Sequence, residues 1–203
     1  MTGAQEGLGR RGFLVGVAAS AVVLTGLTAG QAFAPLAPLN AFAPRVQGGG
    51  PQSLPVNRTA QQAGVTEASL AGWALEVAGP RELLTLSRAQ LEALPQASAR
   101  LPIACVEGWS TTAQWRGVRL RDLLDRAGIA PEKTVRVESV QQHGPYRITT
   151  MPPEYARDPL TLVALAVNGE DLDLDHGFPA RIIAPARPGV LQTKWLRAIR
   201  EQA

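Results

Sequence analysis

The chain has very few of the residues that form disulfides or bind metals. Its 203 residues include a single cysteine, Cys105, and only two histidines, His143 and His176. One cysteine cannot form an internal disulfide, so a disulfide-stapled scaffold is excluded. One cysteine and two histidines also lack the ligand spacing of a structural zinc site. Any metal in this protein would need most of its ligands from another source.

Long runs of one charge are missing as well. The sequence has 20 Lys and Arg against 17 Asp and Glu, which gives a net charge of +3, and its arginines are scattered. Scattered basic residues argue weakly for an anionic ligand and against a nucleic-acid partner. Hydrophobic residues make up 45% of the chain. At this length, that content is enough for one folded domain with its own core.

The N-terminal segment has no charge between Arg11 and Arg45. A membrane span needs about 20 apolar residues, and positive charges favour the cytoplasmic side of it. The stretch "RRGFL" also resembles the twin-arginine export signal. We therefore predict that residues 1–34 are an export signal or a membrane anchor, and both alternatives stay open. An ordinary core helix is disfavoured because the stretch lacks a polar face.

Residues 35–54 are rich in Pro, Gly and Ala, which is typical of a linker. The folded domain is then expected to cover residues 55–203. In it, apolar runs and period-2 alternation predict strands, and helical spacing with capping signals predicts two short helices. The predicted strands are 73–79, 100–105, 134–140, 160–172 with a turn at Asn168-Gly169, 179–186 and 193–201; the helices are 87–94 and 119–128. Many strands with short helices that do not alternate with them predict an α+β fold.

Cys105 follows the apolar run "RLPIAC", which we expect to be a buried strand. A lone cysteine is most often a small buried hydrophobe. As a nucleophile it would need a nearby base, and as a peroxidatic thiol it would usually need a second cysteine. The remaining option is a soft metal held by one protein thiolate and by the ligands of a cofactor.

The C-terminal third gathers basic residues among glycines and prolines. His176, Arg181, Arg187 and Lys194 fall within "DHGFPARIIAPARPGVLQTK". Arginine forks and a lysine charge suit a phosphate. The spacing is equally typical of a solvated basic surface, so it indicates an anion site without establishing one.

Three ordered motifs resemble the sulfite oxidase family of molybdenum enzymes. They are "CVEGWS" with the following "AQWRGVRLRDLLDRAG", then "ALAVNGEDLDLDHGFPARIIAP", then "TKWLRAI". The resemblance covers about residues 55–203 and implies a sulfite-oxidase-type molybdopterin-binding fold. The sequence is also similar to the catalytic subunits of periplasmic methionine-sulfoxide reductases.

The resemblance implies a role for each matching residue. Cys105 would be the catalytic residue and the protein ligand of molybdenum, beside the sulfurs of the pterin. The residues implied to bind the cofactor are Asn57, Arg58, Ser139, His176, Arg181, Gln192, Thr193 and Lys194. The match at Asn57 and Arg58 is loose, because the family's sulfite oxidases have Arg-Asn-His there.

The implied activity is two-electron oxo transfer on a small sulfur- or nitrogen-oxide type substrate. The sequence shows no haem or iron–sulfur motif, and it does not continue into the immunoglobulin-like domain of true sulfite oxidases. We therefore expect an external electron carrier, such as a membrane cytochrome. The N-terminal segment leads us to expect the catalytic domain on the extracytoplasmic side. The alternatives are a cofactor-free, membrane-tethered binding domain of the same fold and a thiol enzyme that depends on Cys105.

Overall fold

The computed structural model describes residues 9–28, 50–104 and 110–202. The chain divides into two compact units, Met1–Arg45 and Val46–Ala203, which we treat separately. In the first unit, α1 (Arg10–Thr28) is a single helix, and apolar side chains such as Phe13 and Val22 are largely exposed. Across the described residues, none of the helices is both long enough and apolar enough to cross a membrane.

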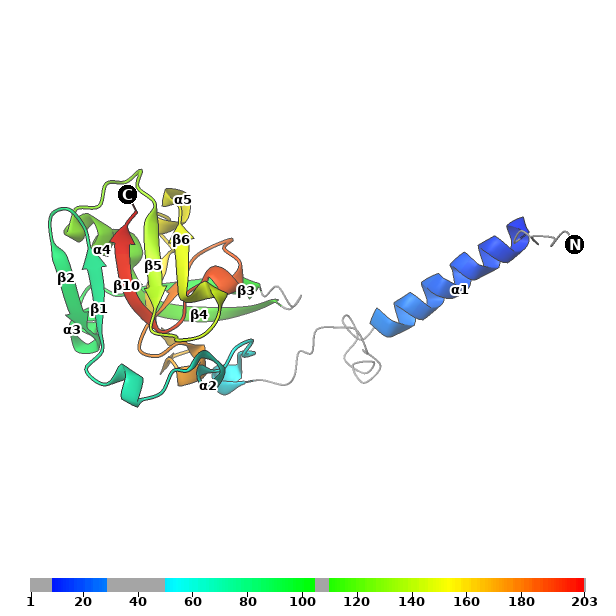
Figure 1. Cartoon of the computed structure of the whole chain (residues 1–203), viewed down its shortest axis with the longest axis horizontal. Helices are drawn as coiled ribbons and strands as arrows, with labels where there is room; N and C mark the ends of the chain where they lie inside the picture. The colour runs from blue at the N-terminus through cyan, green and yellow to red at the C-terminus, as the bar shows by residue number, and fades with distance from the viewer. Residues whose placement is uncertain (1–8, 29–49, 105–109, 203) are drawn as a thin grey trace, which may run out of the picture. The chain divides into compact units, whose positions relative to one another are not determined.

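The second unit contains two five-stranded sheets (Figure 1). The first sheet has the order β2-β1-β10-β5-β6, in which β1 and β10 are parallel and the other neighbours are antiparallel. Its strands are β1 (Ala74–Ala78), β2 (Leu83–Ser87), β5 (Val135–Ser139), β6 (Ile148–Met151) and β10 (Leu196–Glu201).

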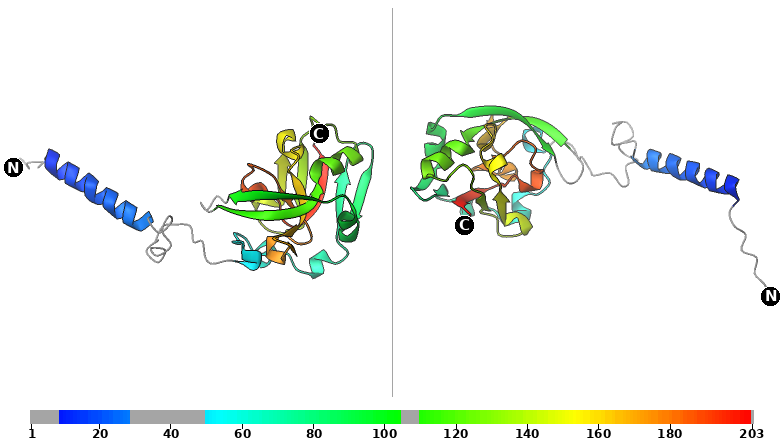
Figure 2. Two further views of the ribbon diagram at one scale, coloured as in Figure 1. Left: turned by 180° about the vertical axis from the view of Figure 1, so that it is seen from behind. Right: turned by 90° about the horizontal axis from the view of Figure 1, so that it is seen from above.

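The second sheet has the order β3-β4-β7-β8, and β9 also pairs with β7. In Figures 1 and 2, β3 and β4 form one long antiparallel pair that crosses the first sheet at a steep angle. The strands of this sheet are β3 (Ala97–Ala104), β4 (Ser110–Arg119), β7 (Leu162–Val167), β8 (Glu170–Asp171) and β9 (Arg181–Ile183).

Short helices precede the first strand of this unit and lie between later strands. They are α2 (Ala60–Ala63), α3 (Arg88–Ala93), α4 (Leu120–Ala127), α5 (Pro153–Ala156) and the 3₁₀ helices η3 (Pro51–Ser53), η4 (Ala68–Leu70), η5 (Pro145–Arg147), η6 (Leu174–His176) and η7 (Gly189–Leu191). The largest apolar cluster joins both sheets and α4, for example through Leu75 of β1, Leu124 of α4 and Leu165 of β7. This mixed architecture confirms the predicted α+β fold.

Local signals predicted several elements correctly. Ser87 and Gln90 form the expected capping box at the start of α3. Gly128 ends α4 in the left-handed conformation, with φ of 82°. Asn168 and Gly169, with φ of 52° and 90°, make the tight turn between β7 and β8. Positive φ at both positions is what a two-residue hairpin loop requires.

Two predictions need correction. The strand before Cys105 is not buried on both faces: in β3, Leu101 and Ile103 are buried, whereas Arg100 and Pro102 are exposed. The packed chain also begins before the expected start of the domain, because Leu54 is only 3% exposed and Pro51 and Gln52 contact residues of the C-terminal third. Proline and glycine content placed these residues in the linker, but their long-range hydrogen bonds place them in the fold.

Candidate cofactor site

Two adjacent hollows in the second unit contain most of the residues that the sequence singled out. His176, Arg181 and Lys194 line the first hollow, together with Leu54, Pro55, Asn57, Ile103, Thr111 and Gly189. The second hollow is lined by Asn57, Arg58, Gln141, Tyr146, Gly189, Val190, Gln192, Thr193 and Lys194. Asn57, Gly189 and Lys194 belong to both. Among the described residues that line them, none is a carboxylate.

Gly177 allows the basic residues of the site to approach one another closely. His176 ends η6, and Gly177 follows it with φ of 106°. A Cβ atom at Gly177 would lie 3.0 Å from the Cβ of Lys194 and 3.2 Å from that of Arg181. Glycine therefore serves here both for its left-handed backbone and for the close approach of the two basic residues.

Arg181, on β9, is a buried cation. It is 3% exposed, and its guanidinium donates to the carbonyl oxygens of His176 at 3.0 Å and Gln192 at 3.4 Å. In the described part of the chain no carboxylate pairs with it, and its Nε is buried without a partner. Burial lowers the pKa of Arg181 to about 10, so it stays charged at neutral pH.

Lys194 holds the N-terminal residues of the domain against the same hollow. Its Nζ donates to the main-chain oxygens of Arg58 at 2.8 Å and Asp175 at 2.7 Å. The ammonium also lies 5.3 Å from the ring centroid of Trp195. Lys194 therefore adds a second positive charge that is oriented by backbone oxygens.

His176 is neutral at physiological pH. The ring is 2% exposed, and its Nε2 lies 2.7 Å from the carbonyl oxygen of Pro51. Burial is the largest cause that lowers its pKa below 6.5; the bond to Pro51 raises it, and the charges of Arg181 and Lys194 lower it again. A neutral imidazole can donate from one nitrogen and accept at the other.

The segment before β10 offers amide and hydroxyl groups. Gln192 is 2% exposed; its Nε2 donates to the carbonyl oxygen of Arg187 at 2.8 Å, while its Oε1 is buried without a described partner. Thr193 shares a hydrogen bond of 3.1 Å with Thr149. An unpaired buried oxygen is costly unless a ligand or water donates to it.

Ser139, Asn57 and Arg58 differ in how they lie relative to the two hollows. Ser139 does not line either hollow; its hydroxyl donates to the carbonyl oxygen of Lys194 at 2.7 Å and so supports the segment that carries the lysine. Asn57 lines both hollows. Arg58 donates to the carbonyl oxygens of Gln62 and His143, and its Nε is buried without a described partner.

Cys105 lies outside the described residues, so its ligand role stays a prediction. The strands on either side of it reach the first hollow, because Ile103 of β3 and Thr111 of β4 line it and are register partners. The ideal Cβ position at Gly189 lies 2.9 Å from the carbonyl oxygen of Ala104.

Arg187 has a structural role that the sequence did not reveal. It is 3% exposed, and its guanidinium donates to the carbonyl oxygens of Leu191 at 2.9 Å and Thr150 at 2.7 Å. Arg187 therefore shapes the loop that presents Gln192, and burial lowers its pKa. Its position among other basic residues was visible in the sequence, but its inward direction was not.

The donors in and around the two hollows fit an anionic, hydrogen-bonding cofactor. Arg181 and Lys194 supply positive charge, and the unpaired Nε of Arg181 and Oε1 of Gln192 leave one donor and one acceptor for a ligand. Phosphate and pterin groups need this combination of charge, donors and acceptors. The fold and this site define a protein that encloses a polar, anionic cofactor in a basic pocket.

Comparison with known proteins identifies the family. Residues 62–203 match the family described as oxidoreductase molybdopterin binding domain, to which this chain belongs. It is therefore a molybdopterin-binding oxidoreductase domain. This result confirms the family and the cofactor that the three motifs predicted.

The relatives include proteins of several lengths. The chain is 33% identical to the uncharacterized oxidoreductase YuiH of Bacillus subtilis over 63% of this chain and 64% of YuiH. It is also 33% identical to the mitochondrial sulfite oxidase of Drosophila melanogaster, over 62% of this chain and 26% of that protein. The matched region thus spans less than two thirds of either relative.

A solved structure shows the same fold. The sulfane dehydrogenase SoxCD from Paracoccus pantotrophus superposes with a TM-score of 0.58 at 22% identity. The superposition covers 73% of this chain and 40% of the SoxCD chain. At this identity the likeness shows the fold alone.

Proposed function

We propose that this chain is the catalytic domain of a molybdenum enzyme that performs two-electron oxo transfer on a small sulfur- or nitrogen-oxide type substrate. The observation that carries the proposal is the buried Arg181 beside His176 and Lys194, in a hollow whose described lining has no carboxylate. A buried guanidinium without an acidic partner is expensive unless a ligand supplies the negative charge.

Different residues would bind different parts of the cofactor. Lys194 and Arg181 would bind its phosphate through charge-assisted hydrogen bonds, which are shorter and stronger than neutral ones. His176, Asn57 and Gln192 would pair with its polar pterin edge. When bound, the cofactor supplies the metal that exchanges two electrons and an oxygen atom with the substrate. The protein supplies orientation and a positive field that favours developing negative charge.

The proposal includes an external electron carrier and export. We expect a separate carrier, such as a membrane cytochrome, to exchange electrons with the domain. The Arg10-Arg11 pair and the uncharged stretch after it support an export signal or a retained anchor, with the domain on the extracytoplasmic side. The enzyme would then act on a substrate outside the cytoplasm.

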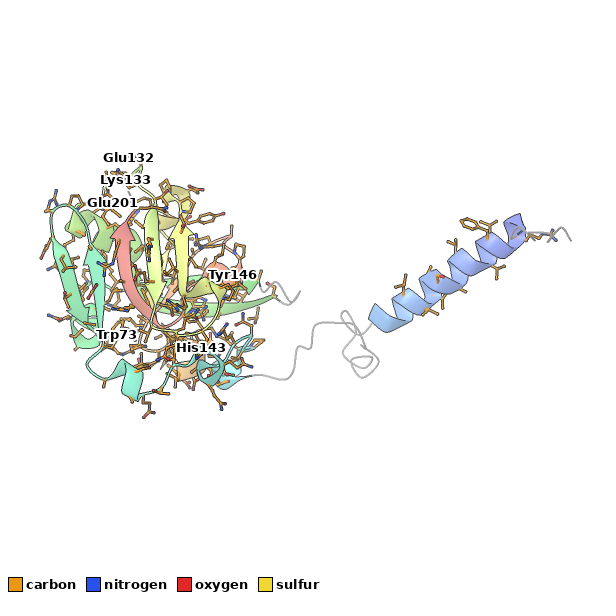
Figure 3. The ribbon with its side chains drawn as sticks, in the orientation of Figure 1. Trp73, Glu132, Lys133, His143, Tyr146 and Glu201 are labelled. Carbon is orange, nitrogen blue, oxygen red and sulfur yellow. The ribbon has the colours of Figure 1, made fainter. Side chains whose placement is uncertain are left out.

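The decisive experiment measures molybdenum and pterin on full-length protein made in a host supplied with molybdate. We expect about one of each per chain in the natural protein. Lys194→Ala should weaken cofactor binding by roughly 2–5 kcal/mol, because the partner charge is left unpaired. Lys133→Ala is the matched control: its ammonium pairs with Glu201 at 3.1 Å, at the opposite end of the domain from His143 (Figure 3).

The same measurement separates the alternatives. Full pterin content in Lys194→Ala would contradict the anchoring role. A folded natural protein without metal or pterin would instead support the cofactor-free binding domain. Catalysis by metal-free protein that depends on Cys105 would support the thiol enzyme.

A further inference from the structure

The segment Pro51–Arg58, here called the strap, lies across the first hollow. Pro55 and Asn57 line the hollow, and Leu54 is buried beside them. Both ends of the strap are bonded to basic site residues: the carbonyl oxygen of Pro51 to His176 and that of Arg58 to Lys194. The strap therefore contributes one wall of the hollow and takes its position from hydrogen bonds to residues more than a hundred positions away.

One strap residue makes three long-range hydrogen bonds. Gln52 donates from Nε2 to the carbonyl oxygen of Asp171 at 2.6 Å, and its Oε1 accepts from the Asp173 N–H at 3.0 Å. Its main-chain oxygen accepts from Asn168 Nδ2 at 3.0 Å. The side-chain amide thus bridges an acceptor in β8 and a donor on the residue just before η6.

These bonds hold an unfavourable backbone conformation. Gln52 has φ of 58° and ψ of 26°, and Ser53 has φ of 59°. Residues with a Cβ atom occupy this region only when the surroundings enforce it. The hydrogen bonds of Gln52 supply that constraint, whereas no bond of the Ser53 side chain is seen among the described contacts.

Pro51, which precedes Gln52, connects these hydrogen bonds to the cofactor site. The carbonyl oxygen of Pro51 can only accept, so the hydrogen of His176 must be on Nε2, which lies 2.7 Å away. In the neutral ring, Nδ1 then carries a lone pair and accepts hydrogen bonds. The position of Pro51 thereby decides which hydrogen-bonding pattern His176 offers to the cofactor.

We propose that Gln52 is a positioning residue that latches the strap, closes the first hollow around the pterin and fixes His176 as the Nε2–H tautomer. The identity of the bound group rests on the proposed function; the latch and the tautomer rest on the hydrogen bonds of Gln52 and Pro51. Glutamine suits the position because its amide both donates and accepts. A glutamate there would lose the donor and add another negative charge beside Asp171 and Asp173.

The test compares two glycine variants that relieve the same backbone strain. Gln52→Gly removes the latch, whereas Ser53→Gly leaves the latch in place. Gln52→Glu keeps the size of the side chain and removes the donor. The first readout is the rate at which purified holoprotein releases its fluorescent pterin. The second is the tautomer of His176 in cofactor-free protein, read from its ring ¹⁵N shifts.

We expect Gln52→Gly and Gln52→Glu to release pterin faster by roughly fivefold, the factor that corresponds to one net hydrogen bond. Both should also show a mixture of His176 tautomers, while Ser53→Gly behaves as the natural protein. Natural release rates and a single tautomer in both Gln52 variants would overturn the latch. If the natural protein carries no pterin, the proposed function fails, but the tautomer still tests the latch.

Discussion

The guanidinium of Arg181 lies over the ring of Trp115, 5.2 Å from its centroid, inside the domain. Trp115 is fully buried on β4, and Arg181 reaches it from β9. A planar guanidinium can lie flat on the indole and donate from separate nitrogens in a fixed fork, whereas a lysine ammonium is a single point charge without this planar geometry. The stacked ring therefore orients the charge that faces the first hollow.

Arg181→Lys should consequently destabilise the cofactor-free protein as well as reduce its pterin content. The carbonyl oxygens of His176 and Gln192 would lose a charged donor, at a cost of about 1–3 kcal/mol. Denaturant unfolding of the cofactor-free protein measures this change. Arg116→Lys is the control, because Arg116 lies exposed on the same strand as Trp115. Equal stability of the two variants would show that Arg181 does not depend on its fork geometry.

Cys105→Ser should abolish oxo transfer and leave a folded protein. The hydroxyl is a harder and far less acidic ligand than a thiolate, and the change in volume is small. Turnover with an artificial electron donor or acceptor, together with circular dichroism, checks both halves of the prediction. Unaltered turnover in Cys105→Ser would rule out the ligand role.

The stability of the domain should fall in mild acid because of His176. Since its pKa is lowered from 6.5 in the folded state, the folded protein binds fewer protons than the unfolded chain as the pH falls below 6.5. The stabilisation is therefore complete above pH 6.5 and is lost as the pH drops through the folded-state pKa.

His176→Gln should remove this part of the pH dependence, because glutamine can still donate to Pro51 but does not titrate. Unfolding free energies at about pH 7.5 and about pH 5.5 provide the comparison. His143→Gln is the matched control, since His143 is the other histidine in the sequence. The assignment is wrong if His176→Gln retains the natural dependence and His143→Gln loses it.

Local patterns were sufficient where large apolar residues occupy the buried positions of a regular period. Helix α4 was predicted from four apolar residues at helical spacing and one terminal glycine, and all four are buried. Strands β2, β4 and β6 were missed because β2 and β6 are only five and four residues long, and because buried positions of β4 and β6 hold Ala113, Gly117 and Thr149, which give a weak apolar signal. Pairing with neighbouring strands supplies the stabilisation that the local pattern lacks.

The site was only partly predictable for a related reason. Residue type and spacing placed His176, Arg181 and Lys194 near one another, and the structure brings them to one hollow. Side-chain direction could not be read from spacing, so the hydrogen bond by which Ser139 supports the backbone of Lys194 was not predicted. The contact of Pro51 with His176 joins residues 125 positions apart, which no local pattern encodes.

Changing both Arg10 and Arg11 to lysine should trap the loaded enzyme in the cytoplasm. Charge is preserved, so only recognition of the guanidinium pair is lost. The resemblance implies that the pterin is made and inserted in the cytoplasm, and a domain that is already loaded with its cofactor must be exported folded. A folded-protein exporter that reads the arginine pair meets this requirement. Protease added to intact spheroplasts should degrade the natural domain and spare the domain of the double variant.

Arg45→Lys is the control for this export experiment, because it makes the same chemical change at the next charged position of the sequence. Its domain should remain accessible to protease, as in the natural protein. The cytoplasmic fraction of the double variant should contain pterin, which shows that loading precedes export. Protection of the natural domain, or unchanged accessibility in the double variant, would contradict the export signal and favour an anchor that does not depend on the arginine pair.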